Sequence, residues 1–163
     1  MVLLSGVIEK LINMIRIIKL LSFSIIVTLL MSLNFQQLKD NYSLTIIVKN
    51  LRNSKGVVQF ALYNEKGSIP DEKYKKYFKI GNVNIVDNTA SISFKNIPQG
   101  IYAVSVLHDE NKDGKIDKNF ILPTEGIGFS NYNDFGLSNR PNFNRASFTL
   151  KENLTFPVKV IYK

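Results

Sequence analysis

Most of the chain beyond residue 41 consists of short apolar runs separated by turn residues, a pattern typical of β-sandwiches and barrels. In the run 56–63, Val58, Phe60 and Leu62 alternate with other residues, as expected for a strand with one buried face. Further runs of the same kind lie at 44–49, 83–86, 90–95, 101–108, 146–150 and 154–162. The pattern therefore predicts a single all-β domain of about seven strands.

The connections between these runs add detail to the predicted fold. Residues 87–89, Asp-Asn-Thr, predict a hairpin turn between 83–86 and 90–95. The segment 70–79 starts with Pro and acidic residues and ends in Lys, which favours one short helix. Pro157 places part of the last strand at the edge of a sheet, because proline cannot donate a backbone hydrogen bond.

The segment 119–145 shows no convincing periodicity, and a loop of that length in a compact domain is usually functional or a lid. Its aromatic residues favour a loop that packs against the domain, and a sugar- or peptide-binding face is the alternative. These residues are Phe120, Phe129, Tyr132, Phe135 and Phe143.

The N-terminal part differs in kind from the rest. A short basic stretch at 14–19 precedes an apolar stretch at 20–33, the arrangement of a secretory signal. This apolar stretch, about 14 residues, is shorter than the ~20 that a spanning helix needs. We therefore expect export to the periplasm or the medium. Small residues suited to cleavage are scarce after residue 31. The alternative is therefore an uncleaved segment that tethers the protein to the inner membrane.

The predicted organisation follows from these patterns. Residues 1–13 precede a second candidate initiator, Met14, and are interpreted as a start-site extension. Residues 14–35 form the signal peptide or membrane anchor, 36–41 a polar joint, and 42–163 the β domain.

Composition limits the chemistry that the chain can perform. The absence of cysteine excludes disulfides, thiol catalysis and thiolate metal sites. The formal net charge is +8, but the basic residues are scattered, and only Lys73, Lys75, Lys76 and Lys79 lie close together. For an exported chain this charge favours solubility and a partner such as an envelope protein or an anionic surface polymer. Nucleic acid is not an expected partner, and membrane contact is expected only through the N-terminal segment.

The segment after the predicted strand 101–108 places oxygen-bearing side chains at alternate positions around one glycine. Compared with the twelve-residue EF-hand loop, Asp109, Asn111 and Asp113 take positions one, three and five, and Gly114 takes the turn at six. Ca²⁺ prefers about 6–8 oxygen ligands, and a tight loop of this kind supplies several of them. The pattern predicts a calcium site, with a plain solvated turn as the alternative.

The second half of the loop fits the template less well. Lys115 offers its carbonyl at position seven and Asp117 its carboxylate at position nine, but Phe120 stands where a bidentate Glu belongs. The nearest carboxylate that can replace it is Glu125. The candidate metal ligands are therefore Asp109, Asn111, Asp113, Lys115, Asp117 and Glu125, with calcium as the expected cofactor.

A hydrolase is the competing hypothesis. His108 is the only histidine, and with Glu125 and Ser130 it supplies a base, an acid and a nucleophile. Ser130 lacks the strand-to-helix context of a nucleophile elbow, so no catalytic residue is assigned. We expect instead a non-catalytic binding or structural module of the cell envelope.

Several blocks of the sequence resemble the bacterial exported domain-of-unknown-function family 2141. The most specific block runs from 100 to 117 and continues at 123–131, and 51–56 and 141–148 are also similar to that family. The resemblance covers roughly 44–162. It implies an immunoglobulin-like or transthyretin-like β-sandwich that is exported, and it implies no activity, substrate or cofactor. The Ile97-Pro98-Gln99-Gly100 turn resembles one in the regulatory domains appended to carboxypeptidases.

Overall fold

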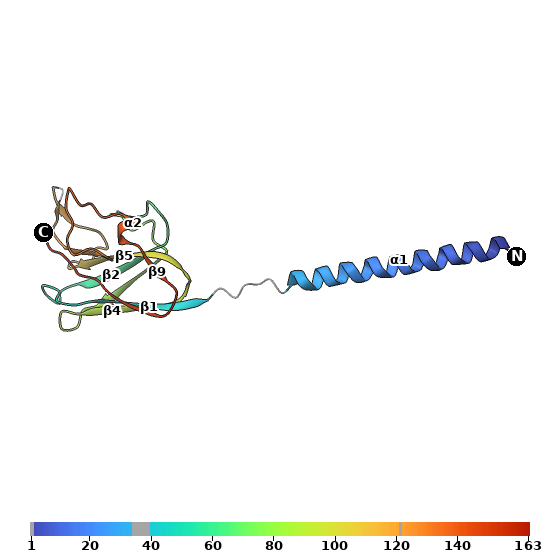
Figure 1. The fold of residues 1–163 in the computed structure, drawn as a ribbon. Helices are drawn as coiled ribbons and strands as arrows, with labels where there is room; N and C mark the ends of the chain where they lie inside the picture. The colour runs from blue at the N-terminus through green and yellow to red at the C-terminus, as the bar shows by residue number, and fades with distance from the viewer. Residues whose placement is uncertain (1, 34–39, 121) are drawn as a thin grey trace. The chain divides into compact units, whose positions relative to one another are not determined.

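The computed structural model describes residues 2–33, 40–120 and 122–163 (Figure 1). Contacts divide the chain into two units, one within 1–38 and the other within 39–163. The first holds α1 (Val2–Leu33), and the second holds every described strand and the short helix α2 (Phe143–Ala146). A mostly β fold with one N-terminal apolar helix is therefore confirmed.

Helix α1 is long and apolar. Its stretch Ile8–Leu29, 22 residues, could cross a membrane by length and composition, and none of it is buried in the structure. A signal sequence has the same features, so α1 is compatible with either role. The helix runs through Met14 without interruption and begins well before the apolar stretch that we expected at 20–33. Most of the predicted polar joint and the residues after 33 that would hold a cleavage site lie outside the described residues.

The described residues of the second unit form ten strands, two of them only two residues long. They are β1 (Asn41–Val48), β2 (Val57–Tyr63), β3 (Lys79–Asn84), β4 (Ala90–Pro98), β5 (Gly100–Asp109), β6 (Lys118–Asn119), β7 (Leu122–Pro123), β8 (Gly126–Phe129), β9 (Phe148–Leu150) and β10 (Leu154–Pro157).

The strands form two larger sheets and one small hairpin. The order in the first is β10-β1-β4, with β10 parallel to β1 and β4 antiparallel. Pro157 ends β10 at the edge of this sheet, as predicted. The second sheet has the order β3-β2-β5-β8, and β9 pairs with the start of β5. Strands β6 and β7 form the hairpin.

A hydrophobic core joins the two larger sheets. Strands β1, β2, β4 and β5 each direct alternate residues into it, because successive side chains of a strand point to opposite faces. Ile46 on β1 and Phe60 and Val106 on the paired strands β2 and β5 are fully buried there. Val158 and Val160, which follow β10, complete this core.

The other face of the second sheet carries a core of its own. Ala61 and Leu107 on β2 and β5 lie under residues from two covering segments, 64–78 and 130–147. Tyr74 comes from the first segment, and Tyr132 and Phe143 come from the second. The described buried residues of both cores all lie in 44–160, so the stretch 40–163 holds both cores.

Two sequence predictions were wrong in detail. Segment 70–79 contains turns instead of a helix, since Tyr74 is buried with a φ of 47° that breaks a helical run. The one short helix is α2, capped by the Asn142 side chain, which accepts from the Arg145 amide. Segment 119–145 contains β8, which had no sequence signal because two of its four residues are glycine.

The predicted turn at 87–89 is present, but its flanking strands do not pair with each other. Val86 and Thr89 exchange two backbone hydrogen bonds across Asp87 and Asn88, both of which have positive φ. Strand β3 then pairs with β2, and β4 pairs with β1. The turn therefore carries the chain from one sheet to the other instead of closing a hairpin within one.

Candidate metal site and the polar network beside it

The candidate site lies where β5 ends. His108 and Asp109 are consecutive, so their side chains point to opposite faces of the sheet. Both are almost completely buried, with 0% and 1% of their surface exposed. A buried polar group must find hydrogen-bond partners, and each of these two organises a separate set of contacts.

The Asp109 carboxylate caps the loop that follows. Its Oδ1 accepts from the amide of Asp113 (3.2 Å), and its Oδ2 accepts from the amide of Gly114 (2.9 Å). Gly114 has a φ of 73°, which glycine adopts without strain, so the chain turns at the position predicted from the sequence.

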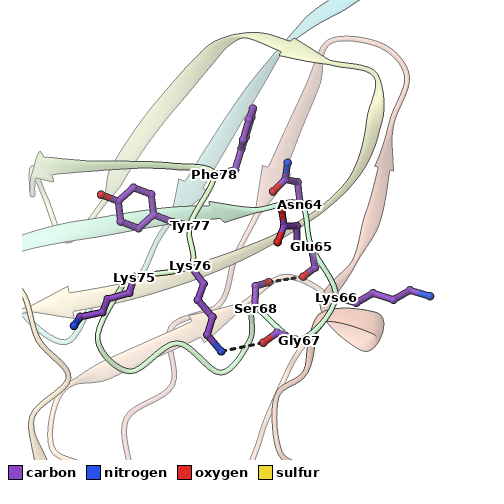
Figure 2. Close-up of a pocket in the computed structure, with 9 residues that line it drawn as sticks. All are labelled: Asn64, Glu65, Lys66, Gly67, Ser68, Lys75, Lys76, Tyr77 and Phe78. Carbon is purple, nitrogen blue, oxygen red and sulfur yellow. Dashed lines mark hydrogen bonds between the residues drawn. The ribbon is translucent and has the colours of Figure 1, made fainter.

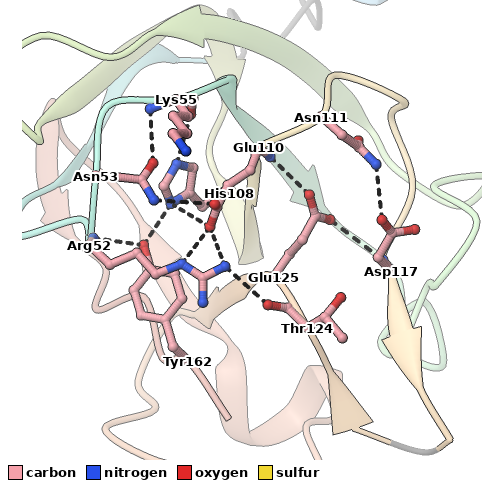
Figure 3. A network of polar contacts seen from close by, with 10 residues as sticks. All are labelled: Arg52, Asn53, Lys55, His108, Glu110, Asn111, Asp117, Thr124, Glu125 and Tyr162. Carbon is pink, nitrogen blue, oxygen red and sulfur yellow. Dashed lines mark hydrogen bonds and ion pairs between the residues drawn. The ribbon is translucent and has the colours of Figure 1, made fainter.

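Asn111 also faces into the loop. Its Oδ1 accepts from the same Asp113 amide (3.0 Å), and its Nδ2 donates to Asp117 Oδ2 (2.9 Å). The side-chain oxygens of Asp109 and Asn111 therefore converge on one N–H group. Figure 3 shows Asn111 and Asp117 turned toward each other across the loop.

Asp113 and Lys115 lie nearer to solvent. Asp113 is exposed, and its Oδ1 accepts from the Lys115 amide (2.9 Å). Within the described residues, no group of three or more His, Cys, Asp or Glu side chains is arranged to hold a metal ion together. An ion bound here would therefore also need the Asn111 amide oxygen and backbone carbonyls, which are ordinary calcium ligands.

Glu125 lies at the base of this loop, and only 5% of its surface is exposed. Its Oε1 accepts from the amide of Glu110 (2.8 Å), and its Oε2 accepts from the amide of Asp117 (3.5 Å), so it links the two ends of the loop. Burial raises the pKa of Glu125, two backbone hydrogen bonds oppose this, and the nearby charges of Asp109 and Asp117 add to the rise. The net pKa is above the ordinary value, chiefly because the carboxyl group is buried.

Beside the loop, Glu110 is the centre of a charged network that the sequence did not reveal (Figure 3). Arg52 contacts its carboxylate at 2.5 Å, and Asn53 Nδ2 donates to its other oxygen (3.2 Å). Partial burial acts to raise the pKa of Glu110, but these two hydrogen bonds and the charge of Arg52 outweigh it. The pKa of Glu110 is therefore below its ordinary value. Arg52 also donates to the carbonyl of Thr124 (3.2 Å).

His108 lies on the opposite face of the sheet from Asp109. Its Nε2 is 2.9 Å from the carbonyl of Lys55, which can only accept, so Nε2 is the protonated nitrogen. Its Nδ1 then accepts from the hydroxyl of Tyr162 (2.6 Å), and the oxygen of that hydroxyl accepts from the Arg52 amide (3.2 Å). Both ring nitrogens are therefore engaged in contacts that join β5 to distant parts of the chain.

Ser130 directly follows β8 and lies beside Val104 in the middle of β5. Its Oγ accepts from the amide of Val104 (2.9 Å) and donates to the carbonyl of Ala146 (2.5 Å), and the side chain is completely buried. Val104 and His108 are four residues apart on one strand, a separation of roughly 13 Å at the usual rise per residue. The structure therefore brings Glu125 to the Asp/Asn loop and leaves Ser130 apart from His108.

Neither Arg52 nor Tyr162 was singled out from the sequence. Arg52 is 58 residues from its partner Glu110, and Tyr162 is 54 residues from its partner His108, so no local pattern marks them. Arg52 lies over the Tyr162 ring, with 4.7 Å between its guanidinium carbon and the ring centre. The only available signal was the turn-rich block 51–56, part of the resemblance described above.

An apolar groove of about 400 Å³ lies near the same loop. The β6–β7 hairpin and the segment 135–141 contribute most of its walls. Its main apolar lining residues are Ile116, Phe120, Leu122, Ile127, Phe129 and Leu137. The expectation that the aromatic residues of 119–145 all pack inward is thus wrong for Phe120, which is 96% exposed.

A second, more polar hollow of about 640 Å³ lies where the lysine-rich segment passes residues 64–68 (Figure 2). Lys66 and Lys75 extend away from each other, and Lys76 donates to the carbonyl of Gly67 (3.3 Å). Because the ammonium groups do not converge, this hollow lacks the arrangement that would hold one anion.

The chain was compared with known proteins at three levels. Residues 46–156 match the model of a family described as an uncharacterized protein conserved in bacteria, DUF2141. No curated protein and no solved structure matched. The matched region runs from β1 to β10 and includes the Asp/Asn loop, Glu110 and Glu125. Since this match covers more than half of the chain, the protein belongs to the bacterial family DUF2141.

Proposed function

We propose that this protein is an exported, non-catalytic binding or structural module of the cell envelope, whose Asp/Asn loop is stabilised by one calcium ion. The observation that carries the proposal is the convergence of the Asp109 and Asn111 side-chain oxygens within a loop whose base holds the buried carboxylate of Glu125. Crowded carboxylates disfavour their charged forms unless a cation is present.

The loop could accommodate calcium with small movements. Asp109, Asn111 and Asp117 already face inward, and Asp113 and the Lys115 carbonyl would complete the shell after a change at the exposed tip. Ordering that tip costs conformational entropy. We therefore expect an affinity like that of extracellular calcium modules, with a Kd of about 10⁻⁴–10⁻³ M.

The hydrogen bonds of the candidate catalytic residues support a non-catalytic role. Both ring nitrogens of His108 are hydrogen-bonded, one to Lys55 and one to Tyr162, and Ser130 is buried between Val104 and Ala146. A hydrolase requires the nucleophile and the base within hydrogen-bond reach, or joined by one water. The register of β5 favours a structural role for both.

The arrangement of the strands supports an immunoglobulin-like or transthyretin-like sandwich as the finer description of the fold. Two sheets facing each other across one core have the general form of such domains. Helix α1 is consistent with export, either as a signal peptide that is cleaved or as an anchor that stays in the inner membrane. The net charge of +8 favours an anionic surface polymer or an acidic envelope protein as partner.

Thermal unfolding of residues 40–163 with and without calcium tests the ion. A ligand that binds only the folded state stabilises it by RT ln(1 + [L]/Kd), or about 1.4 kcal/mol at ten times Kd. That corresponds to a rise in Tm of several degrees for a domain of this size. In Asp113→Asn the side-chain oxygen can still accept from the Lys115 amide, but one negative charge among the calcium ligands is lost. The rise in Tm on adding calcium should therefore largely disappear.

Asp87→Asn is the matched control, because it removes an exposed carboxylate from a distant turn in which Asn also accepts positive φ. It should respond to calcium as the parent does. Calcium that leaves the Tm of the parent unchanged at 10 mM, or that stabilises Asp113→Asn equally, would remove the ion from the proposal.

A further inference from the structure

We propose that the apolar groove between the β6–β7 hairpin and the segment 135–141 binds the hydrocarbon chain of a single-chain anionic amphiphile, with Arg140 pairing with its carboxylate or phosphate. The inference concerns a site distinct from the calcium loop and does not depend on an ion being bound there.

The groove exposes more apolar surface than an isolated surface residue does. Phe120, Leu122 and Leu137 are 96%, 49% and 65% exposed, and they face a floor that includes the buried residues Ile127 and Phe129. Contiguous apolar surface of this kind on a soluble domain marks a ligand or partner site. The volume of about 400 Å³ lies in the range of small-molecule sites.

The charges around the groove favour an anion. Lys118, Arg140 and Lys163 contribute to its lining, against one acidic residue, Glu72. Lys118 is paired with Glu72 at 2.5 Å, and Lys163 is paired with Asp134 at 2.6 Å. The exposed side chain of Arg140 has no hydrogen-bond or ion-pair partner among the described residues. It is therefore available to an anionic group, for which guanidinium has the matching geometry.

The same lining favours a hydrocarbon chain over a peptide. A bound peptide needs partners for its own backbone groups. The side chains that line the groove offer few hydrogen-bonding groups, since most of them are apolar. Two of the three cations are also engaged. A hydrocarbon chain needs no hydrogen bonds, so it suits walls made largely of Phe, Leu, Ile and Pro side chains.

Titration calorimetry of residues 40–163 with decanoate, below its micelle concentration, tests the inference. We expect saturable binding of one decanoate per domain. Phe120→Ser and Leu137→Ser should each weaken it about tenfold, the usual consequence of removing one large apolar contact. Arg140→Gln should weaken decanoate about tenfold and leave the binding of neutral decanol unchanged.

Two substitutions elsewhere serve as controls. Val86→Ser removes an exposed apolar side chain outside the groove, and Lys151→Gln removes an exposed cation; both should bind decanoate as the parent does. All positions changed in the test are exposed, and an unchanged Tm would show that each variant is folded.

Four outcomes would overturn the inference. The first is the absence of saturable binding to the parent, and the second is that Phe120→Ser and Leu137→Ser bind decanoate as tightly as the parent does. The third is binding to anionic lipid vesicles without binding to monomeric decanoate, and the fourth is displacement of decanoate by apolar peptides but not by other amphiphiles. Since calcium is omitted from every arm, a failure here is separate from a failure of the calcium proposal.

Discussion

At the scale of single residues, the end of β5 shows how polar side chains can be buried. His108, Asp109 and Glu125 are each at least 95% buried, yet each has at least two hydrogen-bond partners. Asp109 and Glu125 accept from backbone amides of the loop, and Asn111 shares one of these, the Asp113 amide. Such groups cost about 1–3 kcal/mol when they lose their partners, so these side chains specify one loop conformation.

Glu125 makes folding stability depend on pH. Its pKa is raised in the folded protein, first by burial, so the unfolded chain loses this proton at a lower pH than the folded domain does. The parent domain should therefore lose stability as the pH rises from the ordinary glutamate value through the raised one. In Glu125→Gln this component is absent, and the Tm of the variant relative to the parent should increase from pH 5 to pH 8 without calcium.

Melting curves at several pH values check this prediction. Glu152→Gln removes an exposed carboxylate and should keep the pH dependence of the parent. A constant Tm difference between Glu125→Gln and the parent over this range would mean that Glu125 titrates normally in the folded domain. If calcium binds, it should reduce the difference near pH 8, since a cation stabilises the charged carboxylate.

At the scale of elements, β2 and β5 hold the site together at one end. Their register pairs Val57 with Asp109, directly after the turn at Gly56. Gly56 has a φ of 74°, and a Cβ at this position would lie 1.9 Å from the carbonyl oxygen of Asp109 and 2.6 Å from the Cα of Glu110. Both atoms belong to the backbone, so no side-chain rotation can relieve the contact.

Gly56→Ala should therefore be strongly destabilising. Backbone strain of about 1–3 kcal/mol adds to overpacking of about 1–3 kcal/mol, so we expect a loss of about 2–6 kcal/mol in the free energy of unfolding, measured in urea. Gly67→Ala is the control, because Gly67 has a similar φ of 78° but nothing within 4 Å of its Cβ position. It should cost only the strain. Equal losses in the two variants would contradict the close approach of β5 to Gly56.

Strands whose side chains alternate were predictable from the sequence, and elements defined by distant contacts were not. The pattern at Val58, Phe60 and Leu62 predicted β2 because burial on one face has a period of two. Strand β8 contains Gly126 and Gly128, whose Cβ positions would collide with the segment 158–162. Glycine is required there by a neighbour about 30 residues later, and it makes the strand resemble a loop.

The candidate site divides in the same way. The loop positions from Asp109 to Asp117 follow from local spacing, and the sequence also suggested Glu125, because it is the next carboxylate. The Arg52–Glu110 pair and the contact between His108 and Tyr162 join distant segments. No local rule gives their geometry, since it depends on how the two sheets pack.

At the scale of the whole molecule, the chain combines a domain that has its own cores with a long apolar helix. The described buried residues of the two cores all lie in 44–160. The apolar stretch 20–33 alone falls within the usual 7–15 residues of a signal core, whereas Ile8–Leu29 is long enough to span a bilayer.

A reporter that is active only outside the cytoplasm, fused after residue 40, separates these two roles in a bacterial host. We expect export from translation starts at both Met1 and Met14, because the basic stretch 14–19 and the apolar stretch 20–33 remain in each.

Ile26→Arg should abolish export from either start, since an arginine at the centre of the apolar stretch costs about 2.5–3.5 kcal/mol on insertion. Gln37→Arg, in the predicted polar joint, is the control and should leave export unchanged. Export that requires the Met1 start, or that survives Ile26→Arg, would contradict a signal at 14–35. Reporter activity in the soluble fraction would indicate cleavage, and activity confined to membranes would indicate an anchor. An anchor would hold the domain beside lipid, which is a source of amphiphiles for the groove.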